Sequence, residues 1–213
     1  VDVDKCIGCG LCAEKCPKKV SDSYNQGLST RKAISVPYSQ AVPLKYAIDP
    51  KACIYFKKGK CRACEKVCPS GAINFEDREK TFSLKVGSII LAPGFVSYDP
   101  GQSDTWGINS YPDVVTSLQF ERLLSATGPT FGHLARPSDI TSGVQPRKIA
   151  WLQCVGSRDI NRSGNGYCSS VCCMYALKQA IIAKEHAREP LECVIFYMDR
   201  SEEHTSELQS LLI

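Results

Sequence analysis

CIGCGLCAEKCP at residues 6–17 and CIYFKKGKCRACEKVCP at residues 53–69 each place four cysteines before a proline. Cysteines spaced in this way surround a cubane iron-sulfur cluster with three thiolates, while the fourth cysteine ligates the neighbouring cluster. The spacing therefore predicts two 4Fe-4S clusters. The first would be held by Cys6, Cys9, Cys12 and Cys68, and the second by Cys53, Cys61, Cys64 and Cys16.

The residues around the cysteines also suit this role. Gly8 and Gly10 have no side chain, so the first loop can approach a cluster closely and direct its amide groups at sulfur. The proline after each fourth cysteine ends a short helix. VDVD before Cys6 and YAID before Cys53 complete a repeat of strand, loop and short helix. We therefore expect an α+β, two-cluster ferredoxin-like domain over residues 1–80.

Two other interpretations compete for these cysteines. A disulfide framework requires an oxidising compartment, but the sequence shows no signal peptide and no transmembrane run, and its total of 13 cysteines is odd. Structural zinc sites use two cysteine pairs joined by a spacer. Each motif here is instead one unbroken run of four cysteines that ends in a proline. The spacing favours iron-sulfur clusters over both alternatives.

Composition limits the possible partners. The chain has 213 residues, an apolar fraction of 43% and a net charge of +4, which is typical of a globular protein without a membrane span. Basic residues gather around the motifs, where they form either a solvated face or a docking surface for an acidic redox partner. No aromatic residues interleave with them, which argues against nucleic-acid binding. These basic residues are Lys15, Lys18, Lys19, Lys57, Lys58, Lys60, Arg62 and Lys66.

Both ends of the sequence suggest truncation. It starts at Val1, without an initiator methionine, directly on the first predicted strand, so we expect further residues upstream. RSEEHTSELQS, from Arg200 to Ser210, reads as the in-frame translation of a sequence that resembles a common sequencing-library adapter. We interpret residues 200–213 as a non-native tail and expect no ligand role for His204.

Residues 81–127 are interpreted as part of an FAD-binding domain. From Thr81 to Leu91, polar and apolar residues alternate and then give way to an apolar run. This pattern predicts a strand that stops at a turn. The turn, Ala92-Pro93-Gly94, resembles the Ala-Thr-Gly with which a strand of thioredoxin-reductase-type flavoproteins returns to the flavin, although Pro93 replaces the threonine. An ordinary strand exit is the alternative.

A helix and a linker are expected next. Thr116 and Gln119 form a capping box, which predicts a helix from about Ser117 to Ser125. Its packing residues would be Leu118, Leu123 and Leu124. Residues 128–147 are rich in proline and glycine, so we predict a linker there. His133 lies in this linker with no cysteine or carboxylate at ligand spacing, and we expect it to be exposed.

Residues 148–199 are predicted to form a partial Rossmann-like β-α-β unit. Ile149 to Cys154 and Cys193 to Met198 have strand character, and Val171 to His186 has helical periodicity. The packed face of the helix would carry Val171, Met174, Leu177 and Ile181. A dinucleotide site would need GxGxxG directly after the first strand, but CVGSRD stands there instead.

Four cysteines of this unit gather where a phosphate would be expected. Cys154 ends the first strand, and Cys168, Cys172 and Cys173 lead into the helix, whose positive N-terminus favours thiolate. We hypothesise a third cubane cluster on these four residues. The alternative is that they are buried as small apolar side chains. Cys193, in the middle of a strand, is expected to be a core residue.

These segments together resemble one family. CIGCGLCAEKCP, IILAPGF, IAWLQCVGSRD and YCSSVCCMYALKQAIIAKEH, in this order, are similar to the iron-sulfur A subunits of the CoB-CoM heterodisulfide reductases and their bacterial relatives, from Val1 to Asp199. The resemblance implies that the ferredoxin-like unit is inserted in an α/β, Rossmann-type FAD/NAD(P)-binding flavoprotein, truncated here at both ends. It places FAD near Ala92, Pro93 and Gly94, in a site that is incomplete without the family's upstream glycine motif.

The resemblance also implies a role and partners. The protein would be a cytoplasmic oxidoreductase component that relays, and in many members bifurcates, electrons between FAD, clusters and other proteins. Its partners would be the other heterodisulfide reductase subunits, a hydrogenase or dehydrogenase electron donor, and ferredoxin. We expect no catalytic side chain in this segment and no activity of the segment alone. The alternatives are another flavoprotein with a ferredoxin insert and, from a different class, a zinc-binding interaction module.

Overall fold

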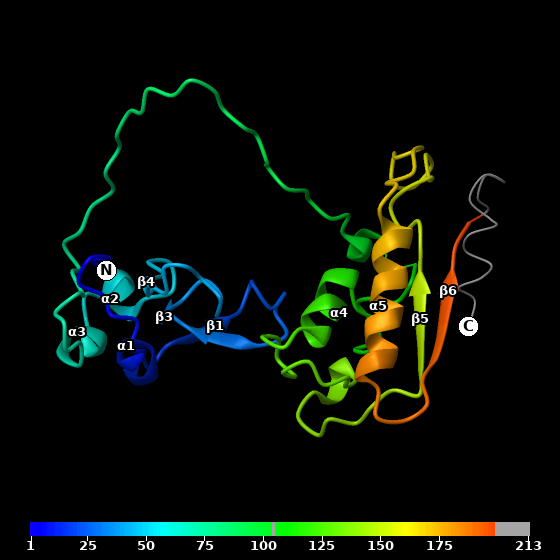
Figure 1. Cartoon of the computed structure of the whole chain (residues 1–213), viewed down its shortest axis with the longest axis horizontal. Helices are drawn as coiled ribbons and strands as arrows, with labels where there is room; N and C mark the ends of the chain where they lie inside the picture. Colours follow the sequence, from blue (N-terminus) through cyan, green and yellow to red (C-terminus); the bar gives the residue numbers. More distant parts are fainter. Residues whose placement is uncertain (104, 199–213) are drawn as a thin grey trace. The chain divides into compact units, whose positions relative to one another are not determined.

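The computed structural model describes residues 1–103 and 105–198, and the chain divides after Gly94 into two compact units (Figure 1). Unit 1 spans Val1–Gly94, and unit 2 begins at Phe95. The tail predicted at residues 200–213, with His204, lies outside the described residues. None of the described helices has both the length and the apolar character needed to cross a membrane.

Unit 1 consists of short elements around the two cysteine motifs. Its helices are α1 (Leu11–Lys15), α2 (Ile54–Lys58) and α3 (Ala63–Lys66). Its strands form two antiparallel pairs, β1 (Lys19–Ser21) with β2 (Thr30–Lys32) and β3 (Ile34–Ser35) with β4 (Ala47–Ile48). As predicted, α1 and α3 end before the proline that follows each fourth cysteine.

The repeat is less regular than the sequence suggests. β4 supplies the strand expected before Cys53, but the strand expected before Cys6 does not form. A turn occupies that place, because the Asp2 carboxylate accepts from the amides of Asp4 and Lys5 and so bends the backbone. The segment after the second motif still lies against the beginning of the unit, since the Asp2 amide donates to the Ala72 carbonyl at 2.7 Å.

Thiols of both motifs lie in one core of unit 1. The buried cluster consists of Cys12, Ile34, Cys64, Ile73 and Phe75. α1 and α3, each of which carries a buried cysteine, also pack against each other. The two motifs therefore fold as one unit, and apolar burial by Ile34 and Phe75 holds their cysteines away from water.

Unit 2 contains the predicted β-α-β order. β5 (Lys148–Leu152) and β6 (Glu192–Phe196) are parallel, with Lys148 opposite Glu192 and Leu152 opposite Phe196. α5 (Cys172–His186) connects them, as a parallel pair requires. Two short 3₁₀ turns, η1 (Pro100–Gln102) and η2 (Pro137–Asp139), lie in the preceding segments.

α4 (Ser117–Leu124) forms where the capping box predicts it. Thr116 Oγ1 accepts from the Gln119 amide at 3.2 Å, and the Gln119 side chain accepts from the Thr116 amide at 2.9 Å. α4 packs against α5 and buries Phe120, Leu123 and Leu124, whereas Leu118 is only half-buried.

The buried face of α5 differs from the prediction. It consists of Cys172, Ala176, Gln179 and Ala183, at helical spacing. Of the residues expected there, Val171, Met174 and Ile181 are 58%, 71% and 50% exposed, and Leu177 is half-buried. Small side chains let α5 approach its neighbours closely, and Gln179 has polar partners inside the core. The large apolar residues therefore do not mark the packed face.

The strand expected over Thr81 to Leu91 does not form. Residues 79–99 have no helix or strand, and Figure 1 draws them as coil. Ile90 is 92% exposed and Leu91 is 84% exposed. A strand needs a neighbouring edge to satisfy its backbone groups, and this segment pairs with no other described segment of the chain.

The linker predicted at residues 128–147 is instead an integral part of unit 2. Leu134 and Ala135 are 4% and 2% exposed. Thr130 Oγ1 donates to the Leu123 carbonyl at the end of α4 at 2.7 Å. The prolines and glycines shape turns that pack on α4 and do not separate two domains. His133 is exposed, as expected, and its Nδ1 lies 3.0 Å from Arg188 Nη2.

Candidate iron-sulfur sites

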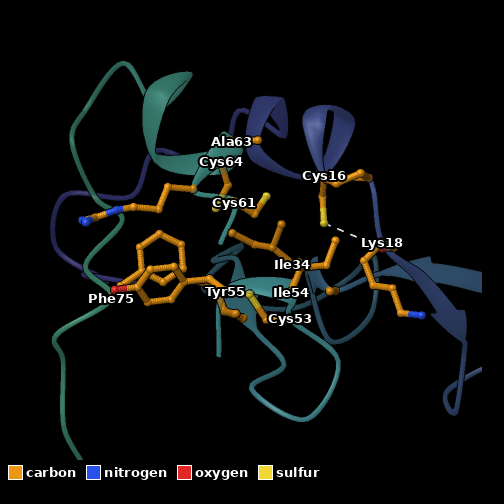
Figure 2. A pocket seen from close by; sticks show the side chains of 14 residues that line it. Cys16, Lys18, Ile34, Cys53, Ile54, Tyr55, Cys61, Ala63, Cys64 and Phe75 are labelled. Atoms are coloured by element: carbon orange, nitrogen blue, oxygen red, sulfur yellow. Dashed lines mark hydrogen bonds between the residues drawn. The ribbon is translucent and has the colours of Figure 1, made fainter. Parts of the chain in front are cut away.

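Four predicted ligands line a single pocket in unit 1. They are Cys16 after α1, Cys53 before α2, Cys61 before α3 and Cys64 within α3. Figure 2 shows their side chains around a space that Ile34, Ile54, Tyr55 and Phe75 also line. Its empty volume, including space open to solvent, is about 360 Å³. Cys16 belongs to the first motif, so the motifs share this pocket in the way that the spacing predicts for the second cluster.

Burial makes the Cys64 thiol hard to ionise. Removal from water, together with charge on Cys53 and Cys16, raises its pKa from 9.0 to about 11, although hydrogen bonds from backbone amides act in the opposite direction. An iron-sulfur cluster is bound by thiolates, so ligation at this position releases a proton. The pocket thus provides soft sulfur donors, and at Cys64 burial favours the thiol over the thiolate.

Three ligands predicted for the first cluster also lie near one another. Burial raises the pKa of the Cys12 thiol, and negative charge on Cys6 and Cys9 raises it further. Cys6 and Cys12 are buried, and Cys9 is exposed. The fourth, Cys68, packs against the same core cluster that contains Cys12. Its assignment to the first cluster remains a prediction.

Hydrogen bonds set the state of Cys68. Burial raises its pKa, but donation from the Ser70 hydroxyl and from the backbone amides of Ala72, Ser70 and Ile73 outweighs burial, so the net pKa is lowered. The Ala72 amide lies 3.3 Å from Cys68 Sγ. Amide donors of this kind stabilise negative charge on sulfur, which suits a ligand.

The first loop requires glycine at two positions, as the sequence indicates. Gly8 has a φ of 72°, and a Cβ there would lie 2.9 Å from the Leu44 carbonyl oxygen. Gly10, which caps α1, has a φ of 84°, and its Cβ would lie 3.1 Å from Tyr46 Oη. The segment around Leu44 and Tyr46 therefore lies directly against the loop that carries Cys9.

Arg62 takes the place of glycine before α3. Its φ is 112°, in the left-handed region. Its guanidinium forms two hydrogen bonds of 2.6 Å to Glu65 and lies 5.5 Å and 5.4 Å from the ring centroids of Tyr55 and Phe75. These contacts hold Arg62 in a backbone conformation that would otherwise favour glycine.

Two lysines that the sequence did not single out touch cysteines of the motifs. Lys45 Nζ donates to the Cys6 carbonyl, and Lys32 Nζ donates to the Cys16 carbonyl at 2.5 Å. Among the predicted basic residues, every lysine is exposed. No spacing signal could have identified Lys32 and Lys45, because both come from the segment between the motifs and reach the cysteines only in the folded unit.

The cysteines of the predicted third site are placed at one end of the β-α-β unit. Cys154 follows β5, and Cys172 is the first residue of α5, which begins at the end of the unit where β5 finishes (Figure 1). These two thiols are 8% and 7% exposed, whereas Cys168 is exposed and Cys173 half-buried. Their shared location does not establish ligation, so the third cluster remains a prediction. Cys193 is half-buried, less than its predicted core position implies.

Neither a site for a single metal ion nor a helix or strand at the predicted flavin contact is present among the residues that the structure describes. No three Cys, His, Asp or Glu side chains within residues 1–103 and 105–198 come close enough to hold a single metal ion. Ala92, Pro93 and Gly94 lie exposed in the coil that ends unit 1. Their predicted contact with FAD remains a prediction.

Comparison with known proteins shows which proteins the chain is similar to. Residues 5–72 match the family described as "4Fe-4S dicluster domain". The chain is 45% identical, over 93% of its length, to the iron-sulfur A subunit of the CoB-CoM heterodisulfide reductase of Methanocaldococcus jannaschii. It is 46% identical to the second such iron-sulfur A subunit of Methanopyrus kandleri and 38% identical to the A subunit of the H2:CoB-CoM heterodisulfide,ferredoxin reductase of Methanothermobacter thermautotrophicus, again over 93%. The chain spans 29% of the length of these relatives. Over that span it is similar to the iron-sulfur A subunits of heterodisulfide reductases.

Proposed function

We propose that this chain is the electron-relay segment of an A subunit of the heterodisulfide reductase type, in which unit 1 holds two 4Fe-4S clusters. The observation that carries the proposal is the pocket lined by Cys16, Cys53, Cys61 and Cys64. These four residues come from both motifs, in the combination that a two-cluster ferredoxin requires.

The side chains of unit 1 would bind, orient and shield the clusters. Cys6, Cys9, Cys12 and Cys68 are the ligands that we assign to the first cluster. Ile34 and Phe75 exclude water from the sulfurs, and amide donors such as that of Ala72 direct positive charge at them. When bound, the clusters supply one-electron acceptor and donor capacity, and the protein sets their distance and potential.

The wider role rests on the family resemblance. We propose that the whole protein relays, and in part bifurcates, electrons between FAD, the clusters and partner proteins in the cytoplasm. Ala92, Pro93 and Gly94 would return to the flavin within that protein. The proposed partners are the other heterodisulfide reductase subunits, a hydrogenase or dehydrogenase donor, and ferredoxin. A third cluster would use Cys154, Cys168, Cys172 and Cys173.

Anaerobic reconstitution of the chain with iron and sulfide tests this proposal. Two cubane clusters require about eight irons per chain, and a third raises the content to about twelve. Cys16→Ser should lower the iron content and leave the protein folded, whereas Cys193→Ser, in β6, should leave the iron content unchanged. Cys172→Ser should lower it only if the third cluster exists. Stoichiometric zinc without iron or sulfide would refute the proposal.

A further inference from the structure

Lys32 and Lys45 differ from every other lysine of unit 1. All lysines within residues 1–94 are described, and these two alone are half-buried, whereas the others are exposed. Each donates to the backbone carbonyl of a proposed cluster ligand, Lys45 to Cys6 and Lys32 to Cys16. Cys6 is assigned to the first cluster and Cys16 to the second, so each site has one such lysine.

Local structure fixes both lysines in place. Lys32 ends β2, whose pairing with β1 sets Lys32 opposite Lys19. Lys45 lies between Leu44, whose carbonyl adjoins Gly8, and Tyr46, whose hydroxyl adjoins Gly10. The backbone of each lysine is thus held in place, and its ammonium group is held by the hydrogen bond to a cysteine carbonyl.

The two ammonium groups have carbonyl acceptors but no carboxylate partner among the described residues. A half-buried cation is costly unless an anion compensates it. Neither Lys32 nor Lys45 forms an ion pair with a carboxylate in the described part of the chain, whereas Lys5 and Lys15 on the same unit do. A carbonyl oxygen provides a hydrogen bond but no net charge. The carbonyls that they contact belong to Cys16 and Cys6, so each ammonium group lies beside a residue that would bind an anionic cluster.

We propose that Lys45 and Lys32 are potential-setting residues, one for each cluster. This inference rests on the two-cluster function proposed above. Each ammonium stabilises the additional negative charge that its cluster acquires on reduction, and so raises the reduction potential of that cluster. At an effective dielectric constant of about 20, a unit charge about 10 Å away changes the ratio of reduced to oxidised cluster by roughly tenfold. A tenfold change is ~59 mV for a one-electron couple.

Redox titration of the reconstituted full chain, followed by electron paramagnetic resonance, tests the proposal. Lys45→Met should lower the reduction potential of one cluster, which corresponds to a roughly tenfold lower ratio of reduced to oxidised cluster at a given potential. Lys32→Met should lower the reduction potential of the other cluster. Lys→Arg at each position should restore the potential because it keeps the charge. Lys→Gln should not restore the potential, because it keeps a hydrogen-bond donor but removes the charge. Lys57→Met, on an exposed side chain of the same unit, is the matched control and should leave both potentials unchanged.

The iron content separates the possible failures. If the unaltered chain binds no iron and sulfide, the proposed function itself is wrong. If the Met and Gln variants carry full iron and both potentials are unchanged, the clusters exist but the lysines do not set their potentials. An equal change for Lys57→Met would also overturn the proposal, because it would show a general effect of surface charge. If the Met variant loses iron, the Gln and Arg variants still decide the role of charge.

Discussion

Replacement of Gln179 by leucine tests the core of unit 2. Gln179 is 2% exposed and connects three elements. Its Oε1 accepts from Trp151 Nε1 of β5 at 3.1 Å. Its Nε2 donates to the Ser117 carbonyl at 3.0 Å and to Glu121 Oε2 at 3.2 Å, both on α4. Leucine preserves the approximate volume but removes all three hydrogen bonds.

The expected loss of stability follows from the hydrogen-bonding groups that lose Gln179 as their partner. The buried indole N–H of Trp151 loses its acceptor, which costs about 1–3 kcal/mol. Glu121 is partly exposed and can turn to water, and the Ser117 carbonyl lies in the first turn of α4, so these lost bonds contribute less. The added apolar surface of leucine offsets about 1 kcal/mol. We expect Gln179→Leu to lower the free energy of unfolding of unit 2 by about 2 kcal/mol.

Urea unfolding followed by tryptophan fluorescence measures this change. Both tryptophans, Trp106 and Trp151, belong to unit 2, so the signal reports on that unit. For an m-value of about 2 kcal/mol/M, the midpoint should fall by about 1 M. Gln153→Leu, a half-buried glutamine whose side chain forms no hydrogen bond among the described residues, is the control and should change the midpoint little. An unchanged midpoint for Gln179→Leu would refute the assigned role of this residue.

Two further predictions concern the sites of unit 1. Gly8→Ala should speed iron loss to a chelator, because a φ of 72° disfavours a side chain and the added Cβ would meet the Leu44 carbonyl. Gly59 has a similar φ of 66° but open space around it, so Gly59→Ala is the control and should lose iron more slowly. In the metal-free chain, iodoacetamide should modify Cys68, whose pKa is lowered, well before Cys64, whose pKa is raised to about 11. Cys64 labelling should accelerate as the pH rises toward 11, because its thiolate fraction at pH 8 is ~100-fold below that of an ordinary thiol. Equal labelling rates at pH 8, measured by mass spectrometry, would contradict this order.

Sequence was sufficient where a short local pattern determines the structure. The capping box of Thr116 and Gln119 needs only four residues, and α4 begins there. The spacing of the cysteines likewise anticipates that Cys16 joins Cys53 and Cys64 at one pocket, although it crosses between motifs. In both cases the chemistry of the residues leaves few other arrangements.

The sequence was insufficient where a structure depends on contacts with a segment distant along the chain. The run from Thr81 to Leu91 has strand character, but alternation cannot supply the neighbouring edge that a strand needs. The packed face of α5 could not be read from apolar residues, because Ala176 and Gln179 fit against α4 and β5 better than Met174 does. Lys32 and Lys45 became visible only once the chain brought them to Cys16 and Cys6.

The crossing of Cys16 into the pocket of the second motif has a consequence for biogenesis. Cys16 is synthesised before Cys61 and Cys64, so on the proposed assignment this thiol has no complete ligand set until the later motif has emerged. On the proposed ligand assignment, neither half of unit 1 completes a site on its own. Metal delivery to this protein is therefore expected to follow synthesis of the whole segment through Cys68, and a chain interrupted between the motifs should receive no stable cluster.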